Sequence, residues 1–396
     1  MKPRLLVLTS TFPRWAGDSE PRFVLDLCRH LAESADVRVL APHTPGAALD
    51  EVLEGVRVRR FRYFFTRCQS LAYAGGIMAR VRANPLRLLL LPFFLLAFAH
   101  AVRAAVRDWP PNVIHAHWII PQGLVAAVTS LAGTPVLCTS HGGDLQALQG
   151  ALFARLKAWI LRRCRYVTVV SESMVLRVRA LVPECRVEVI PMGTDLTTLF
   201  TPSPTSRDVR HLLFVGRLVE KKGVRYLLDA LAILARRYPD LELTVAGDGP
   251  LRPSLERRAA ELGIVDSVHF LGGVPHSSLP DLYRRATLAV FPFVVAADGD
   301  QEGFGLVVVE AMGCGCPVIA SDLPAVHSSV EPGVTATLVP PTDVAALAAA
   351  IAKYLDDPAE RARHADAALA RVHDRFDWRA IAVRYRRVID SLIEQA

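Results

Sequence analysis

Short apolar runs alternate with amphipathic helical patterns along nearly the whole of this 396-residue chain. The runs have the length and branched apolar composition of buried strands, and the stretches between them have the period of helices. Parallel sheets form when each strand is followed by a helix that crosses back over the sheet. The pattern therefore predicts an α/β fold with doubly wound parallel sheets and strands at 4–10, 37–41, 56–61, 112–118, 135–140, 166–171, 186–191, 211–216, 241–247, 267–272, 288–293, 317–321 and 336–340.

The alternation is interrupted once, over residues 191–210. This stretch, PMGTDLTTLFTPSPTSRDVR, contains three prolines and no apolar period, which is typical of a linker. Single hydrophobic cores rarely grow beyond about 250–300 residues, so a chain of this length favours two domains. We predict an N-terminal Rossmann-like domain, a linker, a C-terminal Rossmann-like domain and a final helix, in that order, over residues 1–195, 196–210, 211–375 and 376–396.

The motif that begins at Glu302 follows a predicted strand and opens a helical pattern. Doubly wound sheets bind ligands beyond the carboxyl ends of their strands. Gly303 and Gly305 leave room for backbone amides to approach a ligand, and the helix from Leu306 offers its N-terminal amides to an anion. Carboxylates repel a phosphate, so in such a site they are expected to bind neutral hydroxyls instead. We predict that Glu302 and Glu310 hold sugar or ribose hydroxyls. The alternative is an ordinary surface helix.

Cationic side chains follow the first predicted strand of the second domain. Gly216 and Arg217 come directly after that strand, and Lys221, Lys222 and Gly223 open the next helix. A guanidinium binds two oxygens in a planar fork and an ammonium acts as a point charge, so the pair suits a diphosphate. Cations at a helix N-terminus are otherwise unfavourable, which argues for an anionic ligand. We predict that Arg217 and Lys222 neutralise a diphosphate without a metal.

Histidines follow or occupy the strands of the first domain. His141, at the carboxyl end of a predicted strand and three residues before Asp144, is placed to face a ligand, although such a histidine is also often structural. His115 and His117 alternate on one strand with no third metal ligand, so we interpret them as packing residues. The loop of residues 246–250 lacks the third glycine of a dinucleotide fingerprint, which disfavours a nicotinamide site.

Basic residues concentrate in one segment of the first domain. The whole chain has a formal net charge of +7, and residues 51–110 alone hold ten arginines against three acidic residues. The apolar run 88–99 is shorter than the about 20 residues that a membrane-spanning helix needs. Basic and aromatic residues together suit the face of an anionic bilayer, and the alternative is a core helix beside a solvated arginine-rich face. The membrane interpretation uses residues 57–107 and the aromatic side chains of Phe61, Tyr63, Phe64 and Phe65.

The seven cysteines are scattered and odd in number, and no spacing matches a zinc site. They indicate reduced thiols of a cytosolic protein. The N-terminal apolar run is too short for the core of a signal peptide. A nucleic-acid partner is disfavoured, because no predicted helix carries a basic face of the needed extent.

Together these motifs resemble the retaining nucleotide-sugar glycosyltransferases of family 4, which have the GT-B fold. The resemblance extends through almost the whole chain and rests on PMGTDLTTLF, GRLVEKKG, AGDGP, the block from Glu302 to Glu310, and LVPPTD. It implies two Rossmann-like domains that face a central cleft and a final helix that crosses back to the N-terminal domain. It also implies transfer of a sugar from a UDP- or GDP-type donor to an acceptor hydroxyl, with retention of the anomeric configuration.

The resemblance implies a role for each matching residue. Arg217 and Lys222 would bind the donor diphosphate, and Glu310 the ribose hydroxyls. Glu302 would hold the hydroxyls of the donor sugar, and His141 would reach the sugar or the reaction centre from the N-terminal domain. The rest of the donor site would be made by Gly216, Gly303, Phe304, Gly305 and Leu306. No metal or other cofactor is expected, and neither glutamate need act as a covalent nucleophile.

The chain departs from the family pattern on the acceptor side. Gly17 is a single glycine where relatives have a pair, and we expect Gly17 and Asp144 to line the acceptor side. Three functions stay open: a cytoplasmic, peripheral transferase acting on a lipid-linked or glycan acceptor at the inner membrane face, a nucleotide-sugar epimerase or phosphorylase, and a non-catalytic nucleotide-sugar-binding protein. The presence of both Glu302 and Glu310 argues against the non-catalytic protein and leaves the epimerase or phosphorylase open.

Overall fold

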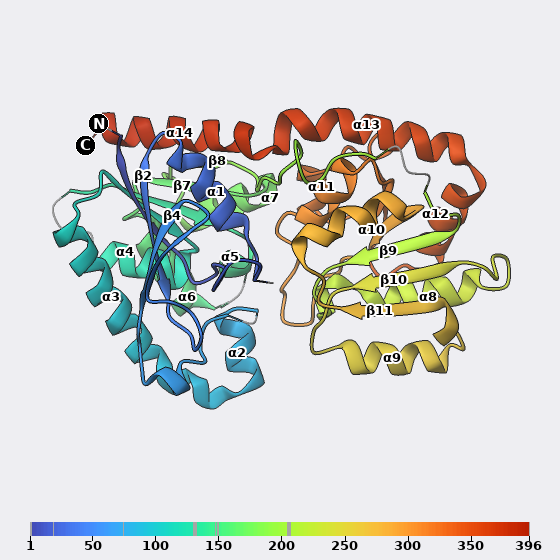
Figure 1. The fold of residues 1–396 in the computed structure, drawn as a ribbon, viewed down its shortest axis with the longest axis horizontal. Helices are drawn as coiled ribbons and strands as arrows, with labels where there is room; N and C mark the ends of the chain where they lie inside the picture. Colours follow the sequence, from blue (N-terminus) through green and yellow to red (C-terminus); the bar gives the residue numbers. More distant parts are fainter. Residues whose placement is uncertain are drawn as a thin grey trace. The chain divides into compact units, whose positions relative to one another are not determined.

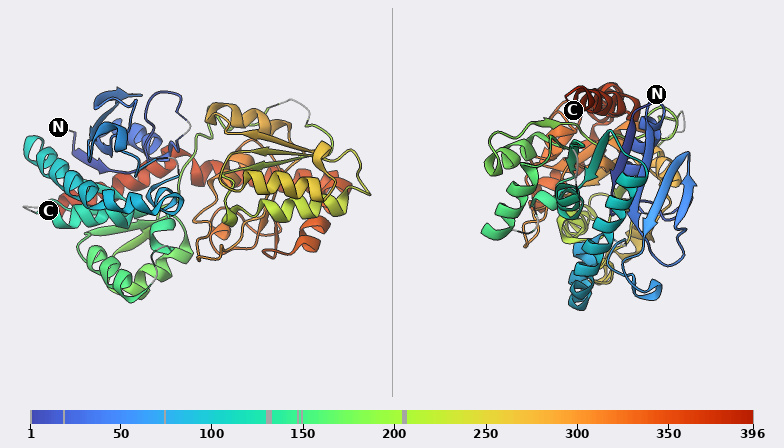
Figure 2. Two further views of the ribbon diagram at one scale, coloured as in Figure 1. Left: turned by 90° about the horizontal axis from the view of Figure 1, so that it is seen from below. Right: turned by 90° about the vertical axis from the view of Figure 1, so that its left-hand side faces the viewer.

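The computed structural model describes residues 2–18, 20–73, 75–129, 133–146, 148, 150–203 and 207–395. The chain forms two compact units, each with helices on both faces of one sheet (Figures 1 and 2). Unit 1 comprises Met1–Ile190 together with Ile381–Ala396, and unit 2 comprises Pro191–Ala380.

Unit 1 contains an eight-stranded sheet in the order β3-β4-β2-β1-β5-β6-β7-β8. Its strands are β1 (Arg4–Leu8), β2 (Asp36–Pro42), β3 (Asp50–Leu53), β4 (Val56–Phe61), β5 (Val113–His117), β6 (Val136–Ser140), β7 (Tyr166–Val169) and β8 (Val187–Val189). Its α-helices are α1 (Phe23–Ala32), α2 (Ile77–Ala83), α3 (Leu91–Asp108), α4 (Leu124–Thr129), α5 (Gly143–Gln146), α6 (Ala151–Leu161), α7 (Glu172–Leu181) and most of α14 (Trp378–Glu394). The strand order reverses between β1 and β5, so the loops after these strands lie at the switch point where such sheets bind ligands.

Unit 2 contains a six-stranded parallel sheet in the order β11-β10-β9-β12-β13-β14. Its strands are β9 (His211–Val215), β10 (Glu242–Ala246), β11 (Val268–Gly272), β12 (Leu288–Phe291), β13 (Val318–Ser321) and β14 (Thr337–Val339). Its α-helices are α8 (Val224–Leu234), α9 (Arg252–Glu261), α10 (Leu279–Arg285), α11 (Leu306–Gly313), α12 (Val344–Asp356) and α13 (Pro358–Phe376). Here the order reverses between β9 and β12, the two strands that precede the predicted donor motifs.

Every predicted run overlaps a strand, which confirms the doubly wound α/β architecture. The sequence analysis missed β3, which pairs antiparallel with β4 at the edge of the sheet. The two strands are joined by a tight turn in which Glu54 and Gly55 have φ values of 50° and 85°. Such a turn needs positive φ at both central residues. Glutamate is unusual in that position, so the sequence carries only a weak hairpin signal.

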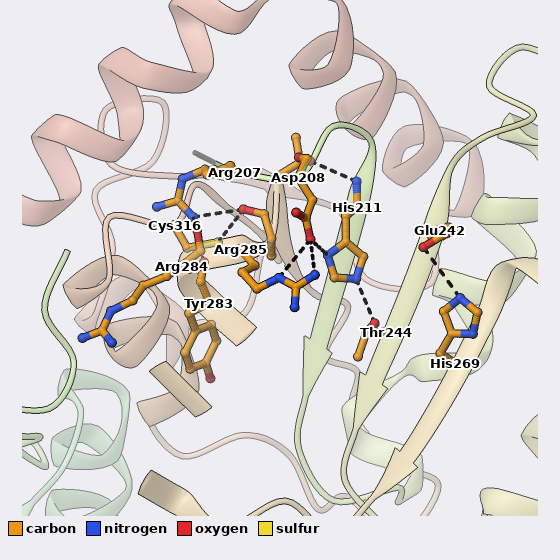
Figure 3. Close-up of polar contacts among 12 residues, drawn as sticks. Arg207, Asp208, His211, Glu242, Thr244, His269, Tyr283, Arg284, Arg285 and Cys316 are labelled. Carbon is orange, nitrogen blue, oxygen red and sulfur yellow. Dashed lines mark hydrogen bonds and ion pairs between the residues drawn. The ribbon is translucent and has the colours of Figure 1, made fainter. Parts of the chain in front are cut away.

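The end of the predicted linker is anchored in unit 2 (Figure 3). The guanidinium of Arg207 donates to the backbone carbonyls of Tyr283 and Ala286 over 2.7 and 3.0 Å. The carboxylate of Asp208 lies 3.2 Å from the guanidinium of Arg285. Charge-assisted contacts of this kind fix the entry into β9, and they depend on residues far along the chain.

Part of the basic segment is buried, which corrects the assignment of Phe61 and Tyr63 to a membrane-facing surface. Phe61 and Tyr63 belong to the core of unit 1, where the ring of Phe61 stacks on Phe98 of α3 with centroids 4.6 Å apart. Arg60 is also buried and pairs with Glu51. The reason is geometric: Phe61 packs between β4 and the rings of α3, whereas Arg60, the preceding residue of the strand, donates to the carbonyls of Ala48 and Pro13 in the neighbouring loops.

One helix in the described part of the chain is long and apolar enough, by length and composition, to cross a membrane. It spans Pro85–Asp108 and combines the 3₁₀ segment η2 (Pro85–Leu90) with α3. All seven cysteines are free, and four of them are buried, as the sequence predicts for reduced thiols.

Candidate functional site

Two loops of unit 2 lie against each other where β9 and β12 end. The amide of Val294, after β12, donates to the carbonyl of Lys221, after β9, over 2.9 Å. Gly223 has a φ of 66°, and a Cβ at this position would lie 1.7 Å from the carbonyl oxygen of Pro292. Only glycine therefore lets the two loops approach this closely.

An ion pair joins the same two loops. Nζ of Lys222 lies 2.7 Å from Oε2 of Glu302, and each side chain is only 13% exposed. Beside it, Nζ of Lys221 lies 3.1 Å from a carboxylate oxygen of Asp300. Burial acts to raise the pKa of Glu302, but the charges of the two lysines and the hydrogen bonds to the carboxylate outweigh it and lower the pKa to about 2. Glu302 is therefore ionised throughout the physiological pH range.

Glu302 also organises the N-terminus of α11. Its Oε1 accepts hydrogen bonds from the backbone amides of Gly303 and Gly305 over 3.1 and 3.2 Å. Gly305 precedes the helix with a φ of 81°, and the side chain of Phe304 is fully buried. The helix itself begins at Leu306. Its first amides have no partner inside the helix, so this end of α11 suits an anion.

Glu310 lies inside α11 and is buried. Its Oε2 accepts a hydrogen bond from the hydroxyl of Tyr283 over 3.2 Å, and its Oε1 lies 3.5 Å from Nε2 of His276. Burial and the nearby carboxylate raise the pKa of Tyr283. The sequence analysis missed Tyr283 and His276. Tyr283 lies on α10 and His276 in the turn that precedes this helix, and both meet Glu310 only through tertiary packing against α11.

The loop after β10 supports the loop after β9. A Cβ on Gly247 would lie 1.9 Å from the carbonyl oxygen of Gly216, and the amide of Leu218 donates to the carbonyl of Asp248 over 2.9 Å. The two loops thus pack backbone against backbone on both sides of Arg217, which is half-buried. The glycines of this loop, Gly247 and Gly249, allow that contact.

In unit 1, His141 follows β6 and is surrounded by rings. Its ring centroid lies 4.9 Å from those of Phe23 and Trp118, and its Nε2 lies 3.0 Å from Nδ1 of His117. Burial lowers the pKa of His141 to about 3 and also lowers the pKa of His117. Both imidazoles are therefore neutral near pH 7, and the bond between them links the tautomer of one to that of the other. His117 is buried, as a packing residue would be, and also positions His141.

Asp144 ties together the loops after β5 and β6. One carboxylate oxygen accepts from the hydroxyl of Ser140 over 2.7 Å, and the other accepts from the amide of Ile119 over 2.6 Å. Burial raises the pKa of Asp144. Both oxygens are thus engaged within unit 1, which gives this side chain a positioning role.

Gly17 lies at an exposed turn in the loop after β1. The turn is closed by Arg14, whose guanidinium contacts the carboxylate of Asp18 over 2.6 and 2.8 Å. The buried Arg60 donates to the carbonyl of Pro13 over 2.8 Å. One arginine of the basic segment therefore holds the predicted acceptor-side loop in place.

The structure brings Gly216, Lys222, Glu302, Gly303 and Gly305 together in unit 2. Arg217 and Glu310 lie in the same unit, whereas His141, Asp144 and Gly17 belong to unit 1. Among the residues that it describes, no group of three or more His, Cys, Asp or Glu side chains could hold a metal ion.

Comparison with known proteins identifies related chains along the whole length. The family model described as Glycosyltransferase Family 4 matches residues 21–198, and that described as Glycosyl transferases group 1 matches residues 198–371. The glycogen synthase of Mycobacterium tuberculosis (strain H37Rv) is 30% identical over 415 residues, which cover 97% of this chain and 94% of that protein. The phosphatidyl-myo-inositol mannosyltransferase of Mycolicibacterium smegmatis is 29% identical over 377 residues, which cover 93% of this chain and 89% of that protein.

Solved structures agree with these sequence matches. The structure of sucrose-phosphate synthase from Thermosynechococcus elongatus is similar with a TM-score of 0.81 and 26% identity, and the similarity covers 100% of both chains. The fold is thus GT-B, with two Rossmann-like units. The chain therefore belongs to the group 1 glycosyltransferases of family 4 and is a glycosyltransferase that uses a nucleotide-sugar donor.

Proposed function

We propose that this enzyme transfers a hexose from a UDP- or GDP-sugar to a hydroxyl of a glycan or lipid-linked acceptor, with retention of the anomeric configuration and without a metal. The observation that carries the proposal is the Lys222–Glu302 pair beside the N-terminus of α11, at the switch point of the unit 2 sheet. A nucleotide sugar joins an anionic diphosphate directly to a neutral, hydroxyl-rich ring. The site offers a cation and a carboxylate within one hydrogen bond of each other, which suits both parts of that ligand.

The cations and the helix end act on the diphosphate. Arg217 and Lys222 bind its oxygens, and the N-terminal amides of α11 add further donors. When the bond between the sugar and the diphosphate breaks, negative charge grows on the leaving oxygen. Fixed cations stabilise this charge without reorganisation, so the reaction needs no metal ion.

The acids and the histidine act on the sugars. Glu302, held ionised, accepts hydrogen bonds from hydroxyls of the transferred sugar. Glu310 accepts hydrogen bonds from the ribose hydroxyls of the nucleotide. His141, as a neutral imidazole, contacts the sugar beside the reacting carbon. The bond from the sugar to the diphosphate breaks and the bond to the acceptor oxygen forms on one face of the sugar, and the acceptor's hydroxyl proton passes to the departing diphosphate oxygen. The configuration is therefore retained with no covalent intermediate on either glutamate.

We propose that the acceptor lies at the inner face of the membrane. The name of the Mycolicibacterium smegmatis relative states a lipid acceptor for that protein, and unit 1 of the present chain carries an exposed apolar and basic surface. The enzyme would then be cytoplasmic and peripheral on the bilayer. Similarity to transferases over the full chain disfavours an epimerase, a phosphorylase or a non-catalytic binding protein.

The test is a donor panel in EDTA. The purified enzyme is incubated with single UDP-, GDP- and ADP-sugars, with either lipid vesicles or soluble oligosaccharides as acceptors, and nucleoside diphosphate release is followed by mass spectrometry. We expect release from one donor by the wild type, and at least about 100-fold less from Glu302→Ala, the scale of losing a transition-state contact. Proton NMR of the product is expected to show the anomeric configuration of the donor.

Three outcomes contradict separate parts of the proposal. Activity that appears only when Mg²⁺ or Mn²⁺ replaces EDTA overturns metal independence. A product with the opposite anomeric configuration overturns retention. Release by Glu302→Ala at the wild-type rate overturns the assignment of this carboxylate.

A further inference from the structure

The outer face of η2 and α3 in unit 1 is apolar. Leu86, Leu89 and Leu96 are 72%, 70% and 71% exposed, and Phe93 is 51% exposed. Leu89, Phe93 and Leu96 follow a spacing of four and three residues and so share one helix face. In Figure 1 α3 lies along the outer side of unit 1, and in the right-hand view of Figure 2 it faces the viewer. Exposed apolar patches of this kind mark interaction sites.

An aromatic side chain from the preceding loop extends this face. Phe65 is 77% exposed, and its ring centroid lies 5.1 Å from that of Phe64, which lies 5.1 Å from that of Phe93. We use the name apolar ridge for the surface formed by Phe65, Leu86, Leu88, Leu89, Phe93 and Leu96.

The segment that carries the apolar ridge is mainly cationic. Residues 55–107 contain ten arginines and no Asp or Glu. Of these arginines, Arg60 is buried, and Arg107 forms an ion pair with the exposed Asp108. Along α3, the exposed residues that continue the same face beyond Leu96 are His100, Arg103 and Arg107. The outer face of this helix thus changes from apolar to cationic along its length.

The inner face of α3 packs in the core of unit 1. Phe94, Phe98 and Val102 are fully buried in the core of unit 1. Although Pro85–Asp108 has the length and composition of a spanning helix, crossing a bilayer would remove these side chains from the core. Only the outer face is available, which suits a helix that lies in the membrane interface.

We propose that the apolar ridge inserts into the head-group region of an anionic bilayer and that the arginines beside it contact the lipid phosphates. A bilayer supplies both an apolar interior and a negative surface, and each arginine near such a surface adds to binding. A second copy of this chain fits less well, because two such surfaces would bring like charges together. The proposal rests on the proposed function in one respect, since docking would hold the enzyme beside a lipid-linked acceptor.

The test is co-sedimentation of the full-length protein with vesicles of phosphatidylcholine, with and without phosphatidylglycerol. We expect binding to the anionic vesicles that weakens with salt. The triple variant Leu89→Ser/Phe93→Ser/Leu96→Ser is expected to bind them at least about tenfold more weakly, since each buried apolar side chain contributes to partitioning. Its matched control is Leu152→Ser/Leu176→Ser, which alters two exposed leucines of α6 and α7 and is expected to bind like the wild type.

A double arginine variant and its matched control test the electrostatic part of the proposal. Arg103→Gln/Arg107→Gln is expected to weaken binding to anionic vesicles and to flatten its salt dependence, while Arg155→Gln/Arg179→Gln, exposed on α6 and α7, leaves both unchanged. The proposal is overturned if the wild-type protein does not bind anionic vesicles, or if the triple variant binds them as strongly as the wild type. Wild-type dimerisation that the triple variant abolishes overturns it in favour of a second copy.

Donor binding is measured on the same samples, so that failure of docking and failure of the donor site can be told apart. The thermal shift caused by UDP or GDP is expected to be equal in the wild type and the triple variant. Vesicle binding without any nucleotide shift contradicts the proposed donor site and leaves docking intact. A nucleotide-induced thermal shift without vesicle binding contradicts docking and leaves the proposed donor site intact.

Discussion

At the scale of single residues, the proposed donor site depends on two opposite charges that stabilise each other while largely shielded from water. Lys222 and Glu302 are only 13% exposed, and each supplies the opposite charge that the other needs. Removing one partner of such a pair leaves the other buried and unpaired, which costs more than the pair contributes. The pair therefore keeps both charges available to the proposed ligand, whose anionic group would contact Lys222 and whose hydroxyls would contact Glu302.

Glu302→Gln separates the two roles of this carboxylate. The amide keeps an oxygen that can accept from the amides of Gly303 and Gly305 but carries no charge toward Lys222. We expect kcat to fall about 100-fold, while the affinity for the nucleoside diphosphate stays equal or rises, because Lys222 no longer has a competing anion. Steady-state kinetics and calorimetric titration with UDP and GDP measure the two effects.

The matched control is Asp300→Asn, which removes the corresponding partner of Lys221 in the same loop. We expect a change in kcat of less than about fivefold, since an outer ion pair contributes little. Equal losses in the two variants would show that loop structure, not the Glu302 charge, governs the rate.

Histidines with lowered pKa values make the stability of the protein depend on pH. Burial lowers the pKa of both His115 and His141 from 6.5 to about 3. Between pH 6.5 and pH 4.5 the unfolded chain therefore binds protons at these residues that the folded protein does not. The free energy of unfolding should decrease as the pH falls through this range, by up to about 1.4 kcal/mol per pH unit for each histidine.

Urea unfolding at a series of pH values measures this slope. His115→Gln, which cannot take up the proton, is expected to show a shallower slope, whereas replacement of the exposed His100 by Gln leaves it unchanged. A slope equal in the wild type and His115→Gln would contradict the assignment.

At the scale of elements, the site is built from loops pressed together by glycine. The loops after β9, β10 and β12 meet backbone to backbone, and a Cβ at Gly223 or Gly247 would lie within 2 Å of a carbonyl oxygen. These contacts hold Lys222 opposite Glu302 before any ligand arrives. Such preorganisation avoids the cost of ordering the loops on binding.

Gly223→Ala tests the contact between these loops. The new Cβ would meet the carbonyl of Pro292, and the residue has a φ of 66°. We expect a loss of about 2–4 kcal/mol in the free energy of unfolding, together with weaker nucleotide binding. Denaturant unfolding and calorimetric titration report the two changes.

Gly263→Ala provides the control, since Gly263 has a φ of 69° and no atom within 4 Å of its Cβ position. It carries the backbone strain alone, which costs about 1 kcal/mol. A Gly223→Ala variant no less stable than Gly263→Ala would refute the steric argument.

At the scale of the whole molecule, the chain divides its tasks between two units. The predicted donor residues lie in unit 2, and unit 1 contains His141, the predicted acceptor-side loop and the apolar ridge. The C-terminal helix α14 returns to unit 1, where the hydroxyl of Tyr385 lies 3.4 Å from that of Thr139. The two ends of the chain therefore contribute to one core.

A nucleoside diphosphate alone is expected to protect only part of unit 2. Hydrogen exchange with saturating UDP or GDP should slow in peptides that cover residues 216–223 and 302–310 and remain unchanged in peptides that cover residues 136–146. At a ligand concentration of 100 times Kd, binding adds about 2.7 kcal/mol to the stability of the state that binds. Protection that appears first around His141 would place the nucleotide in unit 1 and contradict the donor site.

The sequence by itself determined the class of fold, the order of the strands along the chain and the motifs of the donor site. These properties are local, since apolar period, glycine and charge at a strand end can be seen within a short window. The resemblance to family 4 rests on the same windows, and the family and fold comparisons confirm it. The assigned roles of Glu302, Glu310, Lys222 and His141 stay predictions.

Only the tertiary structure decided which residues meet across long stretches of chain. The pairing of Lys222 with Glu302 and of Tyr283 with Glu310 follows from parallel strands ending at one edge and from helix packing, which no local pattern encodes. The same holds for α3, whose first half is apolar on both faces. Its period could not show that Phe94 and Phe98 enter the core while Phe93 and Leu96 stay outside, because the neighbouring sheet, not hydrophobicity alone, selects the buried face.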